Sequence, residues 1–139
     1  MAFAGEKCSI QNSGANVADP SVHLIRNRDF PSHGGGLSMD PGYLATGGHS
    51  GYQALNLAIL AGAKTLLLLG YDAHDPAPGA DDHWFGKHPR NTSPAVYPLI
   101  RKSFRDNAAA IHAAGVLVLN CSPGSAIDAF ERADLADCL

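Results

Sequence analysis

The stretch of residues 71–93 concentrates the side chains that could do chemistry. It has no apolar period, and it carries three histidines and four aspartates. Histidine titrates near neutral pH, so His83 or His88 could serve as a general base or acid. Lys87 and Arg90 could neutralise the phosphate of a leaving group. We therefore predict an active-site lid here, against the alternative of a solvated surface loop.

The same stretch also contains donors for a metal ion. Four side chains could contribute: Asp72, His74, Asp75 and His83. Their spacing includes no pair such as HxxxH on one helix face, which would support a metal site. The sequence therefore predicts neither a metal nor another cofactor.

The TGGHSG sequence at residues 46–51 is a candidate anion-binding turn. It precedes a predicted helix, so it gathers free backbone N–H groups, including those of Gly47 and Gly48, at the positive end of a helix dipole. The hydroxyls of Thr46 and Ser50 add further hydrogen-bonding groups. The turn is neither a Walker motif nor a GxGxxG motif, and a plain helix cap is the alternative interpretation.

Apolar periodicity predicts the elements that position these residues. Residues 50–62 have the spacing of a buried helix that Thr46 or Ser50 caps and Gly62 ends, and residues 65–69 form a continuous apolar run. Such a run is typical of a central strand that is covered on both faces. The other predicted elements are a strand at residues 21–26, a helix at 95–114, a strand at 116–119, and a last helix at 125–130 that resumes near 133.

The alternation of strands and helices predicts βαβ units and a parallel sheet. We therefore expect one α/β domain over residues 1–139, Rossmann-like and three-layered with a mostly parallel sheet. Residues 1–43 would be an irregular N-terminal segment, and residues 44–139 would form the core.

Ligands of such sheets bind beyond the carboxyl ends of the strands. The residues directly after the two main strands are Gly70, Tyr71, Asp72, Asn120, Cys121 and Ser122. Asp72 is the leading polar candidate among them. The alternative is a structural carboxylate that caps the loop or pairs with Arg90.

Composition limits the possible partners and compartments. The 139 residues, 45% of them hydrophobic, suffice for one core, and the net charge of -3 includes no basic stripe for a nucleic acid. Three cysteines without a CxxC pair suggest neither a disulfide framework nor a cysteine zinc site, which fits a reducing cytosol. No apolar stretch reaches the ~20 residues of a membrane span, and residues 1–10 do not look like a signal peptide. We expect a cytoplasmic protein.

Three segments resemble a known family. They are TGGHSGYQALNLAILAGAKTLLLLGYDAH, HWFGKHPRN and VLNCSPGSAIDAF. These segments are similar to uncharacterised phage and prophage proteins and, more remotely, to bacterial CMP-sialic-acid-dependent sialyltransferases and archaeal-type hydroxymethylpterin pyrophosphokinases. The resemblance implies a protein of a phage or mobile element that binds a nucleotide or nucleotide sugar. As an enzyme it would be a transferase of glycosyl or phosphoryl groups.

The resemblance also assigns roles to individual residues. Those around the donor would be Thr46, Gly47, Ser50, Gly70 and Asp72. His83 or His88 would be the base. Relatives start with a strand and a G-[NS]-GPSL turn, which residues 1–20 lack, so the domain is expected to be truncated on its N-terminal side and its activity to be in question.

The missing N-terminal layer would leave apolar surface, which predicts a homo-oligomer, most simply a dimer. The alternative function is accordingly a non-catalytic oligomeric binding or assembly module of a phage or mobile element.

Overall fold

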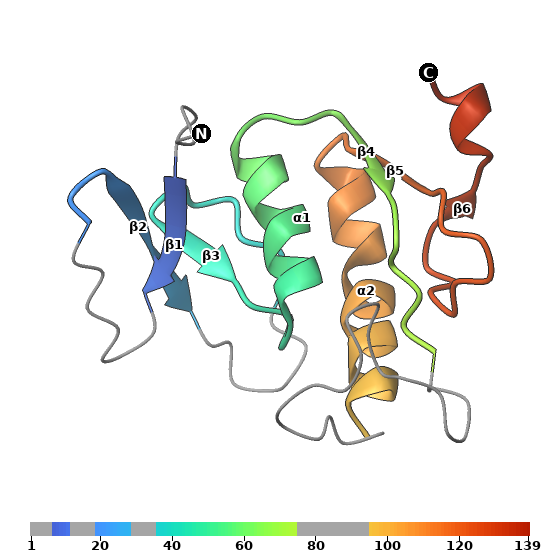
Figure 1. Ribbon diagram of the computed structural model, residues 1–139, viewed down its shortest axis with the longest axis horizontal. Coiled ribbons are helices and arrows are strands. Elements are labelled where there is room, and N and C mark those ends of the chain that lie inside the picture. The colour runs from blue at the N-terminus through green and yellow to red at the C-terminus, as the bar shows by residue number, and fades with distance from the viewer. Residues whose placement is uncertain (1–6, 12–18, 29–35, 75–94) are drawn as a thin grey trace.

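The computed structural model describes residues 7–11, 19–28, 36–74 and 95–139, which form two parallel sheets and two α-helices (Figure 1). The elements in chain order are β1 (Lys7–Gln11), β2 (Val22–Arg28), β3 (Tyr43–Ala45), α1 (Ser50–Leu60), β4 (Thr65–Leu68), α2 (Val96–Ala113), β5 (Leu117–Asn120), β6 (Glu131–Arg132) and the 3-10 helix η1 (Leu135–Asp137). The predicted α/β fold with parallel strands is confirmed. None of the helices in these ranges has the length and apolarity that a membrane crossing requires.

The first sheet has the strand order β1-β2-β3, and all its pairings are parallel. Its middle strand β2 confirms the strand predicted at residues 21–26. The rest of the N-terminal segment is more regular than predicted, because β1 and β3 flank β2. β1 has the half-polar sequence KCSIQ and β3 has only three residues, so neither presents a hydrophobic period.

The second sheet has the order β4-β5-β6 and is also parallel. Its first strand was predicted to be central and covered on both faces, and this prediction is wrong within the described residues. β4 lies at the edge of its sheet and does not pair with β3. Leu69 directly after β4 is 53% exposed, and Leu117 of β5 is 49% exposed. A continuous apolar run thus identified the strand but not its place in the sheet.

Both long predicted helices are present, and they share one hydrophobic core with β3, β4 and β5. The most buried members of this core are Ala45, Tyr52, Leu55, Leu68, Phe104, Ile111 and Ile127. Phe104 of α2 is fully buried and packs its ring against those of Tyr52 and Tyr71. This core fixes the ends of α1, β4 and α2 relative to one another.

The helix predicted at residues 125–130 is absent. The side-chain amide of Asn120 donates to the Ser125 hydroxyl (3.0 Å) and to the Ile127 carbonyl (3.1 Å). The N–H of Ile127 in turn donates to the Ser125 hydroxyl (3.1 Å). These bonds satisfy the backbone in a non-helical conformation and hold Ile127 in the core. β6 and η1 follow instead of a resumed helix.

Candidate functional site

A small cavity lies beyond the carboxyl end of β4, which we call the carboxyl-edge pocket. It has a volume of about 210 Å³ and a mostly apolar lining. The chain after β4 contributes Gly70, Tyr71 and Asp72, the start of α1 contributes His49 and Gly51, and α2 contributes Tyr97 and Phe104. The structure thus brings the predicted site residues Gly70, Tyr71 and Asp72, which we call the GYD corner, into a cavity together with the beginning of α1.

The GYD corner is held by residues 122–125, the SPGS turn, which follow β5. The hydroxyl of Ser122 donates to the Leu68 carbonyl (3.1 Å) and accepts the Tyr71 N–H (2.9 Å). The Ser125 hydroxyl donates to the Tyr71 carbonyl, and the Ala126 N–H donates to the Asp72 carbonyl (2.7 Å). Ser122, a predicted ligand-binding residue, is therefore buried with its hydroxyl shared between two backbone groups, and it acts on the pocket by positioning Tyr71.

Tyr71 forms one wall of the pocket. Its hydroxyl donates to the Gly51 carbonyl in the first turn of α1 (3.1 Å), and its ring meets Phe104 edge to face. Burial raises the pKa of the Tyr71 phenol. The hydroxyl therefore stays protonated at neutral pH and keeps its role as a donor.

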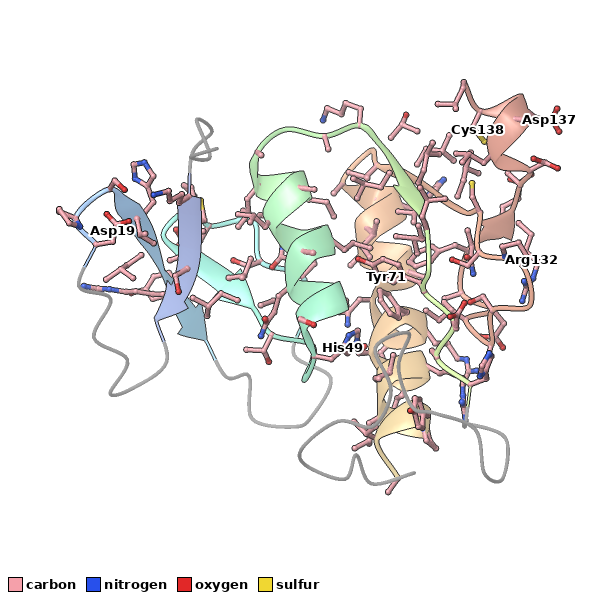
Figure 2. All side chains as sticks on the ribbon, in the orientation of Figure 1. Asp19, His49, Tyr71, Arg132, Asp137 and Cys138 are labelled. Atoms are coloured by element: carbon pink, nitrogen blue, oxygen red, sulfur yellow. The ribbon has the colours of Figure 1, made fainter. Side chains whose placement is uncertain are left out.

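His49 caps α1 in place of the predicted Thr46 or Ser50. Its Nδ1 accepts the Tyr52 N–H (3.2 Å), and its Nε2 lies 2.9 Å from the Ser103 hydroxyl of α2. Because that hydroxyl donates to the Ile100 carbonyl (2.8 Å), it accepts from His49. The neutral ring with hydrogen on Nε2 satisfies the whole chain of bonds. Figure 2 shows His49 and Tyr71 in the region between α1 and α2.

His49 is not among the site residues predicted from the sequence. Histidine is an uncommon helix cap, so the neighbouring threonine and serine were the stronger cap signals. Burial lowers the pKa of His49 to about 4, and both ring nitrogens are occupied. We conclude that this histidine joins α1 to α2 as a neutral structural residue.

Stability should therefore depend on pH through His49. Its pKa is about 4 in the folded chain and 6.5 as the ordinary value, so the unfolded state binds the proton more tightly. The contribution of the neutral His49 ring to the free energy of unfolding is fully present above pH 6.5. It decreases as the pH falls and is lost below about pH 4. We expect a loss of about 2 kcal/mol, less than the full pKa difference implies because the ring is partly exposed.

Urea unfolding measured between pH 7 and pH 4 tests this dependence. His49→Asn keeps a capping side chain that does not titrate, so the decline over this range should become shallower by about that amount. His112→Asn removes an exposed histidine of α2 and should leave the decline unchanged. Equal slopes in the wild type and in His49→Asn would contradict the prediction.

The TGGHSG turn lies at the start of α1, but much of its hydrogen-bonding capacity is used internally. The Thr46 hydroxyl accepts the Gly48 N–H (3.2 Å), and the Thr46 carbonyl accepts the His49 N–H (3.2 Å). Gly47 is buried against the Tyr52 ring. Ser50 instead lines a second cavity of about 200 Å³ beside β1 and β2. The carboxyl-edge pocket is thus lined by His49 and Gly51, and not by the four residues predicted from this turn.

The other predicted site residues lie at the mouth of the pocket or outside the described residues. Asp72 is exposed and lines the pocket. Arg101 of α2 donates to the Ala73 carbonyl (2.7 Å). This bond connects the segment that follows β4 to α2. The lid candidates His83, Lys87, His88 and Arg90 lie outside the described residues, as do Asp75 and His83 of the possible metal set. In the described ranges no three histidine, cysteine or acidic side chains cluster as metal ligands would.

A larger cavity lies beyond the carboxyl ends of β5 and β6, which we call the C-terminal cavity. Its volume is about 510 Å³, and its walls include Cys121, Arg132, Asp134 and Leu135. Arg132 donates to the Ser125 carbonyl and so connects this wall to the SPGS turn. The two cavities share the carboxyl edge of the second sheet.

Comparison of the chain with protein-family models, curated proteins and solved structures gives no match. Functional assignment therefore depends on the geometry of the site.

Proposed function

We propose that the chain binds a nucleotide or nucleotide sugar in the carboxyl-edge pocket of a Rossmann-like α/β domain. The observation that carries this proposal is the position of the pocket. It lies beyond the carboxyl end of the parallel strand β4 and is lined by Tyr97, in the first turn of the next helix, α2. The crossover from β4 through α2 to its parallel neighbour β5 supports the Rossmann-like assignment. The resemblance to sialyltransferases suggests a cytidine nucleotide as the first ligand to test.

The size and lining of the pocket favour one ring of such a ligand. Its volume of about 210 Å³ is below the roughly 300–1,000 Å³ of typical ligand pockets, so the described residues would hold a base or a sugar and not a whole nucleotide. Tyr71 and Tyr97 offer aromatic surface to such a ring. The exposed carboxylate of Asp72 would accept hydrogen bonds from its amino or hydroxyl groups.

The phosphate groups would then be bound by the lid candidates. The chain leaves the pocket at Asp72 and Ala73 and returns to it at Tyr97, so both ends of the intervening segment are fixed at the pocket. Lys87 and Arg90 would neutralise the phosphate. In a transferase, His83 or His88 would take the proton of the acceptor hydroxyl while the glycosyl or phosphoryl group moves to the acceptor oxygen. The bonding electrons would leave with the departing group.

Thermal unfolding of the full chain with CMP, CMP-sialic acid and other nucleotides tests the binding proposal. A ligand at about 100 times its dissociation constant should raise the free energy of unfolding by about 2.7 kcal/mol. Asp72→Ala should abolish this stabilisation. The matched variant Asp137→Ala removes an exposed aspartate that does not line the pocket and should retain it.

Absence of stabilisation by every nucleotide would refute the proposal, and so would an equal loss in both aspartate variants. The runner-up is a non-catalytic assembly module that forms a homodimer. It is favoured by the edge position of β4 and by the exposed Leu69 and Leu117 beside it. A dimer in light scattering together with no response to nucleotides would support this second function.

A further inference from the structure

Two of the three cysteines lie together although they are far apart in the sequence. The sulfur of Cys121, directly after β5, is 3.9 Å from that of Cys138, directly after η1. Both are free thiols. Cys121 is 7% exposed, whereas Cys138 is more accessible. Figure 2 shows Cys138 beside η1, near the C-terminal end of the chain.

We propose that Cys121 and Cys138 form a reversible disulfide that fixes η1 against the carboxyl end of β5. This is a modification site at the wall of the C-terminal cavity, because Cys121 and Leu135 both line that cavity. The proposal is independent of nucleotide binding, since neither cysteine lines the carboxyl-edge pocket.

The local structure allows the sulfur atoms to approach bonding distance. A disulfide has an S–S length of about 2.05 Å, so the two atoms must close by roughly 2 Å. Cys138 follows a single turn of 3-10 helix that is capped by the Asp134 carboxylate, which accepts the Ala136 N–H (2.9 Å). Leu139 beyond it is almost fully exposed. A short exposed turn can shift by this amount more readily than the buried end of β5.

The oxidant would be a small-molecule disulfide of the glutathione type. The Cys138 thiolate attacks one of its sulfur atoms, the S–S bond breaks, and the leaving thiolate takes the electron pair and a proton. The Cys121 thiolate then attacks the Cys138 sulfur and displaces the second small thiol. The two cysteines thus lose two electrons and two protons in total, and the small disulfide becomes two thiols.

The surroundings of Cys138 indicate a slow reaction at neutral pH. Its thiol donates to the Asp134 carbonyl (3.3 Å), and desolvation and the neighbouring Cys121 raise its pKa. The thiolate fraction is therefore small, and the bridge should form faster at alkaline pH. The bridge would enclose the whole of β6, which has only two residues and pairs with β5 over those two positions.

The test uses the full chain with Cys8→Ser, which removes the exposed cysteine of β1. After incubation with glutathione disulfide and alkylation, intact mass should show a loss of about 2 Da without a glutathione adduct or alkylation. The melting temperature should rise by about 5 °C or more and return after reduction. Cys138→Ser in the same background should show neither change.

A stable glutathione adduct as the end product would overturn the proposal, and so would disulfide-linked dimers in place of the intramolecular bridge. A mass loss without a rise in melting temperature would overturn the claim that the bridge fixes η1. The Cys138→Ser variant changes the more accessible of the two cysteines, so it decides the outcome without a substitution at the buried Cys121.

Discussion

Gly47→Ala is expected to lower the free energy of unfolding by about 3 kcal/mol or more. A Cβ atom at Gly47 would lie only 2.2 Å from Cγ of Tyr52, and Gly47 has a φ of 53°. Tyr52 is fully buried in the core, so its ring cannot move away without displacing Phe104, which packs against it. The added methyl group therefore forces a rearrangement at the start of α1. Urea unfolding followed by circular dichroism measures the loss.

Gly48→Ala is the matched control. Gly48 also has a left-handed backbone, with a φ of 78°, but no heavy atom lies within 4 Å of the Cβ position. Its substitution should cost only the backbone strain, roughly 1–2 kcal/mol. If both alanine variants lose the same stability, the close approach of Gly47 to Tyr52 is not what limits this position.

Asn56→Leu should also lower the free energy of unfolding, by about 3 kcal/mol. The side chain of Asn56 is completely buried on α1, where its oxygen accepts the N–H groups of Ala45 (2.8 Å) and Ser38 (3.3 Å). Its Nδ2 donates to the Ser38 carbonyl (2.8 Å). Leucine has the same number and branching of side-chain heavy atoms but leaves all three backbone groups without these partners. The amide thus connects α1 both to β3 and to the chain before β3.

Chemical unfolding of Asn56→Leu and Gln53→Leu separates this effect from a change in helix propensity. Gln53 lies on the same helix and is only half-buried, and its side chain takes no part in the bonds to Ser38 and Ala45. Gln53→Leu should change stability by less than about 0.5 kcal/mol. A loss below 1 kcal/mol in Asn56→Leu would show that the network contributes little.

The sequence predicted the elements that have a strong apolar period. α1 and α2 each bury one face in a common core, and β4 and β5 are apolar runs between glycines, so their positions were predicted closely. β1 and β3 were not predicted, because their stability comes from pairing with β2 and not from a local pattern. The false C-terminal helix has the same origin, since Asn120 acts on Ser125 and Ile127 from another element.

The candidate site was predicted in part. The general rule for parallel strands pointed to Tyr71 and Asp72, and the structure places both in a pocket. The roles of His49 and Ser122 depend on partners more than 50 positions away in the chain. A local motif does not reveal such partners. For this reason the sequence did not predict the role of His49. It predicted a ligand-binding role for Ser122, whose hydroxyl binds backbone groups in the structure.

The parallel pairing of the strands also affects how the pocket forms during folding. Every strand pair in the described residues is parallel, so none arises from a short hairpin. The bond from Ser122 to Leu68, which shapes the Tyr71 wall, joins residues 54 positions apart. Such contacts require closure of long loops, which slows folding, and they are lost when the chain unfolds. The pocket is consequently a property of the completed fold, so a ligand held there would retard unfolding and protect the chain from proteases.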